Sequence, residues 1–220
     1  IMGDLTDIVS LKRAVTWCDF LFHVAADYRL WVPEPETMYA INVQGTENMM
    51  VEALRAGVQK IIYTSSVATL KINNTGESTD ENAAASVEDM IGHYKRSKFL
   101  AETAVMRLIE RQGLPAVVVN PSTPVGPRDI KPTPTGRFIK DAAAGRMPAY
   151  VNTGLNIVHV DDVAMGHLLA LKHGKAGERY ILGGYNLKLK EILFEIANIA
   201  GCRPPRICLP HRLIVTMAFF

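Results

Sequence analysis

The chain has 220 residues, 48% of them hydrophobic, which is enough apolar surface for one sizeable core. Its formal net charge of +2 is close to balance and gives no reason to expect nucleic acid or an anionic membrane as a partner. The three cysteines, Cys18, Cys202 and Cys208, are too few and too irregularly spaced for a disulfide framework or a zinc site. We therefore expect no metal and a reducing, cytoplasmic location.

Both ends of the sequence look cut. The chain opens on Ile1 without an initiator or a targeting signal, and it closes on the apolar run 213–220 without a helix stop signal. That run is too short to span a bilayer, so a truncated core helix is expected there. We expect an internal piece of a longer protein without a membrane span.

Short apolar runs alternate with longer amphipathic stretches, which predicts the α/β class with a parallel sheet. In the first part of the chain, a strand is expected at 20–26, a helix at 35–56, a strand at 58–66 and a polar loop at 71–89. A helix from about Tyr94 to Gln112 should stop at Gly113. The remaining elements are expected as a strand at 116–120, an irregular loop at 121–136, a helix at 137–145, an extended piece at 155–160, a helix at 161–173 capped by Asp161, a strand at 180–184 and a helix at 187–200.

Small or polar residues follow three of the predicted strands. They are Ala25-Ala26, Ser65-Ser66 and Asn120-Pro121-Ser122. In open parallel sheets, ligands bind beyond the carboxyl ends of the strands. The sequence therefore predicts a binding site at this edge of the sheet.

Ser66 and the pair Tyr94 and Lys98 could carry acid–base chemistry at that edge. Tyr94 and Lys98 are four positions apart, so on a helix they share a face. A nearby ammonium favours the phenolate, and lowering a tyrosine pKa by about 3 units takes roughly 4 kcal/mol. Ser66 could hold the substrate oxygen. With seven tyrosines in the chain the spacing could arise by chance, as an exposed helical pair, but the preceding strand favours catalysis.

Two further groups of residues keep an alternative explanation. The run 159–162, His-Val-Asp-Asp, could bind a metal or relay protons, although a helix cap is the simpler explanation. A basic cluster could neutralise a diphosphate or could be an ordinary solvated face; its members are Arg128, Lys131, Arg137, Lys140 and Arg146. No Gly-x-Ser-x-Gly motif occurs, which argues against a serine hydrolase.

These motifs, in this order, resemble the extended short-chain dehydrogenase/reductase superfamily, specifically its NAD-dependent epimerase/dehydratase proteins. The hopanoid-associated sugar epimerase group is the most similar, and dihydroflavonol reductases are related. The segments that carry the resemblance span nearly the whole chain and are 3–7, 23–28, 42–46, 63–66, 93–98, 120–127 and 159–162. The resemblance implies a Rossmann-like domain at 1–125 that lacks its Gly-rich N-terminal unit. It implies that 126–220 contributes the last strands and part of a substrate-binding region.

The resemblance also implies a role for each matching residue. Tyr94 would be the acid/base, Lys98 would lower its pKa and hold the nicotinamide ribose, and Ser66 would bind the reacting oxygen. The cofactor, NAD or NADP, would contact Asp4, Leu5, His23, Val24, Ala25, Ala26, Asn42, Thr64, Tyr94, Lys98, Pro121 and Ser122. The substrate would contact Ser66, Tyr94, Asn120 and Arg137.

The implied function is an epimerase of a sugar or nucleotide sugar that works through a transient ketone. One alternative is a ketone or aldehyde reductase of the dihydroflavonol-reductase type, and a second is a dinucleotide-binding protein without catalysis. The substrate would then be a sugar nucleotide or a carbonyl compound, and a homodimer is a further expectation. A 4,6-dehydratase is disfavoured because Val67 and Ala68 follow Ser66, where that branch carries an Asp-Glu pair.

Overall fold

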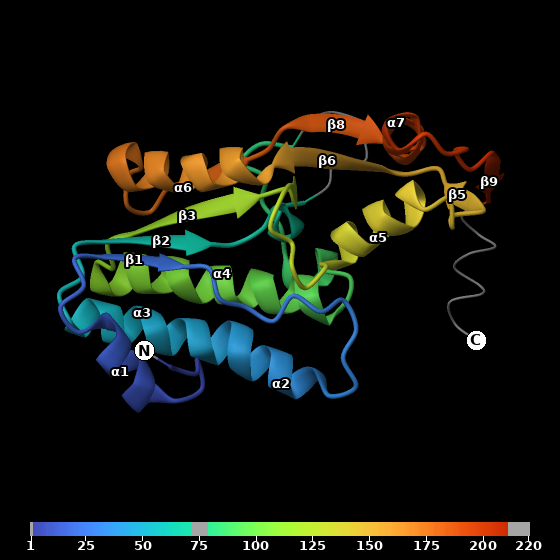
Figure 1. Cartoon of the computed structure of the whole chain (residues 1–220). Helices are drawn as coiled ribbons and strands as arrows, with labels where there is room; N and C mark the ends of the chain where they lie inside the picture. Colours follow the sequence, from blue (N-terminus) through green and yellow to red (C-terminus); the bar gives the residue numbers. More distant parts are fainter. Residues whose placement is uncertain (1, 72–78, 211–220) are drawn as a thin grey trace. The chain divides into compact units, whose positions relative to one another are not determined.

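The computed structural model describes residues 2–71 and 79–210, which fall into two compact units (Figure 1). The first unit consists of the chain up to Pro121 together with Ala164–Leu182, and the second consists of Ser122–Val163 and the residues from Gly183 on. Part of the predicted loop at 71–89 and the apolar run 213–220 lie outside the described residues.

The first unit is built on a four-stranded parallel sheet in the order β1-β2-β3-β7. The strands are β1 (Phe20–His23), β2 (Lys60–Thr64), β3 (Ala116–Pro121) and β7 (Arg179–Leu182). Every residue of β3 is buried, as expected for a Val-rich strand covered on both faces. The predicted α/β class with a parallel sheet is confirmed, although β1 and β2 end two or three residues earlier than predicted.

Helices cover both faces of this sheet (Figure 1). One face packs against α1 (Ile8–Val15), α3 (Thr46–Arg55) and α4 (His93–Gln112). The other face packs against the part of α6 (Val160–His173) that belongs to this unit. The buried side chains of the first face include Val15, Met50, Ile61, Val105 and Val118, and those of the second are Ile62, Val117, Val119 and Ala170.

The helix predicted at 35–56 is interrupted. It consists of α2 (Pro35–Tyr39), a π-helical turn (Ala40–Gly45) and α3. Wide turns of this kind are rare and often occur at functional sites, where they re-aim a side chain. Here the turn contains Asn42, which is buried and fully hydrogen-bonded, as described below.

The long helix α4 matches its prediction. It ends at Gly113, whose φ of 66° is a left-handed conformation that glycine adopts without a steric cost. Short 3₁₀ turns occur at Val67–Thr69 and Val87–Asp89. Within residues 2–71 and 79–210, no helix combines the length and the apolar character that a bilayer crossing requires.

The second unit holds a three-stranded sheet in the order β4-β6-β8 and a small pair, β5 with β9. Its elements are β4 (Thr123–Val125), α5 (Pro134–Ala143), β5 (Ala149–Val151), β6 (Gly154–His159), β8 (Tyr185–Lys188), α7 (Leu189–Ala200) and β9 (Ile207–Leu209). The expectation of an irregular loop throughout 121–136 is wrong, because β4 pairs with β6 and α5 begins at Pro134. These pairings join distant segments, so local sequence does not reveal them.

The predicted cap of α6 is also corrected. The helix begins at Val160, so Asp161 lies inside its first turn. The capping acceptor is instead His159, whose Nδ1 accepts a hydrogen bond of 3.2 Å from the Asp161 backbone N–H. The His-Val-Asp-Asp run is thus a helix start in which the imidazole takes the role expected of the carboxylate.

Candidate active site

Ser66 and Tyr94 interact at the carboxyl edge of the first unit's sheet. Ser66 directly follows the end of β2, and its Oγ caps the following 3₁₀ turn by accepting from the Ala68 N–H at 3.1 Å. Tyr94 is the second residue of α4. Burial raises the pKa of Tyr94, and a hydrogen bond with the Ser66 side chain partly offsets that rise. The phenol is therefore protonated at neutral pH in this structure.

Lys98 lies one turn further along α4 and reaches back to β2. Its Nζ donates to the Thr64 carbonyl at 2.8 Å and to the Tyr63 hydroxyl at 3.4 Å. Burial lowers the pKa of Lys98 to about 8, and the charge of Glu102 opposes that fall. An ammonium has three N–H groups, so these two contacts leave a third for a hydroxyl of a bound molecule.

His23 packs against Tyr63, the residue that Lys98 contacts. Its ring stacks on Tyr63 with centroids 5.8 Å apart, and its Nε2 lies 3.1 Å from the Thr46 hydroxyl. Burial, followed by the charge of Lys98, lowers the pKa of His23 to about 4. His23 is therefore neutral at pH 7, and its side chain lies in the core while the chain continues to the sheet edge.

The segment after β1 is a suitable place for a cofactor. Val24 is 59% exposed, Ala25 is exposed and Ala26 is partly buried, so the backbone here carries little side-chain cover. Small side chains let a ligand approach the main chain closely. Together with the third N–H of Lys98, this open backbone fits the ribose and nicotinamide end of NAD or NADP.

Asn42 connects this segment to α4 through hydrogen bonds. Its Oδ1 accepts from the Asp27 N–H at 2.7 Å, and its Nδ2 donates to the Asp27 carbonyl at 2.8 Å and to the Ser97 hydroxyl at 2.9 Å. The side chain is 1% exposed, so water cannot replace these partners. Asn42 thus fixes the chain after Ala26 against α4.

Replacing Asn42 with Ala should destabilise the protein because it leaves the Asp27 main chain and the Ser97 hydroxyl without their partner. We expect the free energy of unfolding to fall by about 1–3 kcal/mol, the usual cost of buried groups left unpaired. Urea unfolding of Asn42→Ala beside Asn48→Ala, whose side chain pairs with Gln44 on an exposed face, checks this. Equal stability of the two variants would contradict the role given to Asn42.

Asp4 and Leu5, which the family resemblance places against adenine, form a tight turn before α1. Asp4 accepts from the Thr6 N–H and hydroxyl at 2.8 and 2.7 Å, which lowers its pKa. Leu5 packs directly on the π-helical turn, because a Cβ added at Gly45 would lie 2.7 Å from the Leu5 Cβ. The turn is therefore held against the same helical segment that positions Asn42.

The other predicted contact residues divide between the two units. Thr64 offers its carbonyl to Lys98 and places its hydroxyl 2.8 Å from His167 Nε2. Asn120 and Pro121 are buried at the end of β3, and Asn120 is 0% exposed. Ser122 and Arg137 belong to the second unit, where Arg137 donates to the Pro132 carbonyl at 3.2 Å.

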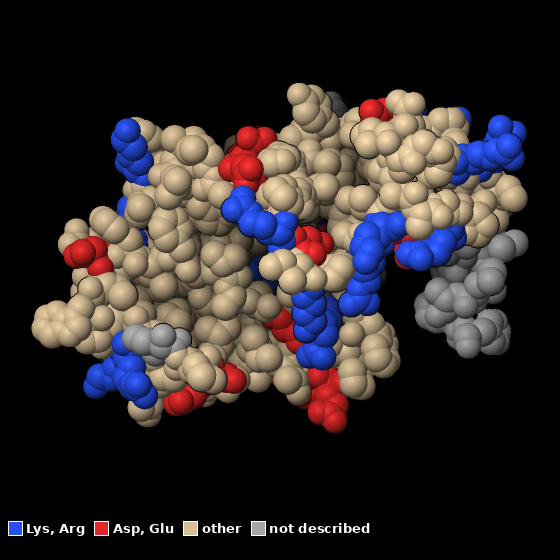
Figure 2. All heavy atoms as spheres, viewed as in Figure 1, with Lys and Arg blue, Asp and Glu red and all other residues tan. Residues whose placement is uncertain are grey.

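The basic cluster is partly neutralised within the second unit. Lys and Arg side chains gather in the region of α5 in Figure 2. Arg128 pairs with Asp161 at 3.2 Å, and Arg146 pairs with Asp141 at 2.5 Å. These pairs are exposed and contribute little to stability. They also supply carboxylates that a bound diphosphate would have to displace or tolerate.

Two residues near the candidate site were not predicted from the sequence. Tyr63 is 1% exposed and contacts both His23 and Lys98. Glu102 is 4% exposed and lies one turn beyond Lys98 on α4. The spacing of Tyr94, Lys98 and Glu102 at intervals of four is a signal that could have placed Glu102 on the same helix face.

A parallel α/β sheet with a serine at one strand end and a Tyr-x-x-x-Lys helix beside it is the arrangement that the resemblance to extended short-chain dehydrogenases/reductases implies. Comparison with known proteins gives the family. Residues 1–183 match the sequence profile of the NAD dependent epimerase/dehydratase family. The chain belongs to this family, which confirms the predicted family and the predicted cofactor class, NAD or NADP.

Similar curated proteins include two bacterial ones. A Synechocystis protein named "Putative dihydroflavonol 4-reductase" is 46% identical over 223 aligned positions, which cover 100% of this chain and 64% of that protein. "Sterol demethylase protein B" of Methylococcus capsulatus is 35% identical, with 98% of this chain and 65% of that protein covered. The chain thus spans slightly less than two thirds of these relatives.

Two solved structures have closely similar folds. The structure of gox2253 is 57% identical with a TM-score of 0.94, and the match covers 99% of this chain and 66% of that one. A nucleoside-diphosphate-sugar epimerase from Pseudomonas aeruginosa, PA4631, is 26% identical with a TM-score of 0.84, covering 99% and 67%. Both support the Rossmann-like fold.

Proposed function

We propose that the protein interconverts a hydroxyl and a carbonyl group on a small organic substrate, with Tyr94 as the acid/base. The observation that carries this proposal is the placement of Ser66, directly after β2, next to a partly buried and protonated Tyr94 at the start of α4. A general acid must be protonated and within hydrogen-bond reach of the oxygen that it serves. Family membership supports an enzyme over a dinucleotide-binding protein without catalysis.

The chain's own residues act on the oxygen of the substrate. In the reducing direction, Tyr94 gives its hydroxyl proton to the carbonyl oxygen as that oxygen gains charge, and Ser66 donates a hydrogen bond to the same atom. The Lys98 ammonium stabilises the phenolate that Tyr94 becomes. In the oxidising direction each step reverses. NAD or NADP, when bound, would supply or accept the hydride at the adjacent carbon.

Net reduction of a carbonyl compound is the favoured overall reaction. The Synechocystis relative is named a dihydroflavonol reductase, and a Medicago truncatula relative that is 31% identical is named a cinnamoyl-CoA reductase. The protonated state of Tyr94 also suits proton donation. The second candidate is epimerisation of a nucleotide sugar through a transient ketone, which the likeness to the Pseudomonas epimerase supports.

Cofactor stoichiometry separates these candidates. The full-length protein is assayed with NADH or NADPH and a panel of aromatic ketones, aldehydes and nucleotide sugars. We expect one reduced cofactor to be consumed for each carbonyl substrate turned over, read as loss of absorbance at the nicotinamide band. Turnover of a nucleotide sugar with no net change in cofactor would instead support the epimerase. Cofactor binding without any turnover would contradict both.

A further inference from the structure

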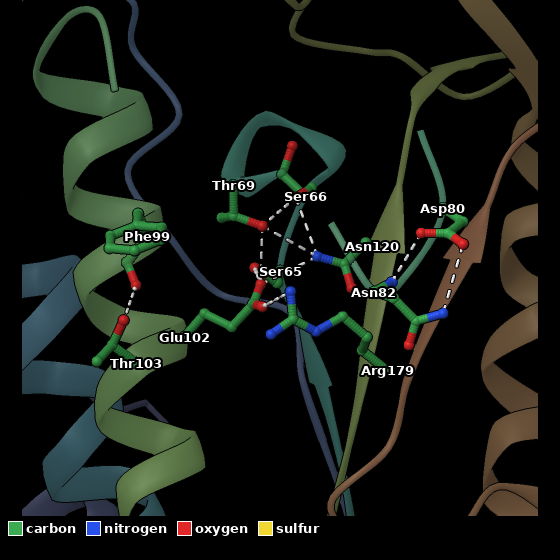
Figure 3. Close-up of polar contacts among 10 residues, drawn as sticks. All are labelled: Ser65, Ser66, Thr69, Asp80, Asn82, Phe99, Glu102, Thr103, Asn120 and Arg179. Atoms are coloured by element: carbon green, nitrogen blue, oxygen red, sulfur yellow. Dashed lines mark hydrogen bonds and ion pairs between the residues drawn. The ribbon is translucent and has the colours of Figure 1, made fainter. Parts of the chain in front are cut away.

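A buried carboxylate, Glu102, lies close to the turn that carries Ser66 (Figure 3). It is on the same face of α4 as Tyr94 and Lys98 and is 4% exposed. A buried charge is costly unless its neighbours pair with it and satisfy its oxygens. The contacts of Glu102 therefore show which neighbouring groups the carboxylate holds in place.

Among the described residues, every polar neighbour of Glu102 carries a hydrogen that it can donate. Its Oε2 accepts from the hydroxyls of Ser65 and Thr69, the latter at 2.9 Å, and from Asn120 Nδ2 at 3.0 Å. Its Oε1 lies 3.3 Å from a guanidinium nitrogen of Arg179 on β7. Figure 3 shows these side chains converging on the carboxylate from the segment after β2, from β3 and from β7. An ionised carboxylate is the one carboxyl form that only accepts, so it matches this set of partners.

The same donors hold the main chain of Ser66. The Ser66 carbonyl lies 2.8 Å from Thr69 Oγ1, whose one hydrogen is shared between this carbonyl and Glu102, and it accepts from the Thr69 N–H at 3.1 Å and from Asn120 Nδ2 at 3.0 Å. Thr69 and Asn120 also contact each other at 3.2 Å. Because each of these two side chains contacts both Glu102 and Ser66, the carboxylate orients the groups that fix the turn carrying the Ser66 hydroxyl.

Glu102 also faces Lys98 electrostatically. Its charge raises the pKa of Lys98, against the larger lowering that burial causes. The other titratable groups that face Lys98 are Tyr63 on β2, His23 on β1 and Tyr94 on α4. None of these supplies a negative charge at neutral pH, since burial also raises the pKa of Tyr63 and Tyr94.

We propose that Glu102 is a positioning residue for the reaction: it holds the Ser66 turn through Thr69 and Asn120, and it places a negative charge one helical turn from the Lys98 ammonium. This inference rests on the proposed function, because it assigns Glu102 a role in presenting Ser66 and Lys98 to the substrate and cofactor. Glu102 itself acts through these residues and contacts neither ligand.

Substituting Gln for Glu102 tests the proposal with little change in shape. The amide would point an NH₂ group at donors in either orientation, because donors surround both carboxylate oxygens. We expect kcat of the full-length Glu102→Gln variant to fall about tenfold to a hundredfold, because a misplacement of about 1 Å in a catalytic group can cost about a hundredfold in rate. The high-pH limb of the kcat/KM profile should move to lower pH, because Lys98 loses the charge that favours its protonated form.

The matched control is Glu110→Gln, the same change at an exposed position on the same helix. If Glu102→Gln and Glu110→Gln give the same kcat and the same pH profile, the positioning role is wrong. If Glu102→Gln does not fold, Thr69→Val decides, since it keeps the shape and removes one shared hydroxyl; an unchanged kcat in that variant would overturn the proposal. A Tyr94→Phe variant with normal turnover would instead refute the proposed function itself.

Discussion

Replacing Tyr94 with Phe is expected to abolish turnover while leaving cofactor binding nearly intact. The substitution removes the hydroxyl that we propose gives a proton to the substrate oxygen, and it keeps the aromatic ring at the start of α4. General acid–base catalysis contributes about 10²–10⁴-fold to a rate, so kcat should fall by at least that range. Steady-state assays and titration of cofactor fluorescence measure the two quantities.

Tyr180→Phe is the matched control for this variant. Its hydroxyl accepts from the Lys175 N–H at 3.2 Å and donates to Glu178 at 2.6 Å, on the surface at the start of β7. Removing it should leave kcat within about twofold of the unaltered protein, in line with surface substitutions elsewhere. Near-normal turnover by Tyr94→Phe would remove the basis of the acid/base assignment.

Replacing Lys98 with Met should separate activity from stability. We expect turnover to be lost, since the phenolate of Tyr94 and a cofactor hydroxyl both lose their cation. The free energy of unfolding should rise in this variant at neutral pH, because folding lowers the Lys98 pKa from its usual 10.5 to about 8. A lysine with a lowered pKa resists folding while it is charged, so it costs stability below pH 8 and costs progressively less as the pH rises towards 10.5.

The pH dependence of unfolding makes this quantitative. Between pH 8 and pH 10 the unaltered protein should gain about 2 kcal/mol of stability relative to Lys98→Met, from the shifted pKa of this one group. Lys60→Met is the control, because Lys60 on β2 also donates to a main-chain carbonyl, that of Gly174, at 2.7 Å. A pH-independent difference between Lys98→Met and the unaltered protein would show that Lys98 is not desolvated as described.

The elements of the first unit were largely predictable because their signals are local. The Val-rich run of β3, the Gly113 stop and the amphipathic stretch of α4 can each be recognised without knowledge of the rest of the fold. The second unit was harder to predict. Its strands β4, β5, β8 and β9 have three or four residues each and are defined by their pairing partners, and no short window of sequence contains that information.

The candidate site residues with a recognisable sequence spacing could be predicted, and their catalytic roles remain predictions. Ser66, Tyr94 and Lys98 follow from a strand end and an interval of four residues. The contacts of Lys98 with Tyr63 and Thr64 depend on how α4 lies on β2, and sequence spacing does not give that geometry. Likewise, nothing in the sequence indicated that Asn120 contacts Ser66, so Asn120 was predicted only to contact the substrate. The structure adds a second role, holding the Ser66 carbonyl, and the substrate contact remains a prediction.

The extra residue in the π-helical turn at 40–45 changes the angle about the helix axis between the side chains before the turn and those after it. Counted along a regular helix, at about 100° per residue, Met38 and Met50 would point about 120° apart. One inserted residue reduces that angle to about 20°, and both methionines are 0% exposed. A redesign that straightened this stretch into a single uniform helix would therefore rotate one of two buried thioethers out of the interior, however favourable each substitution looked by itself.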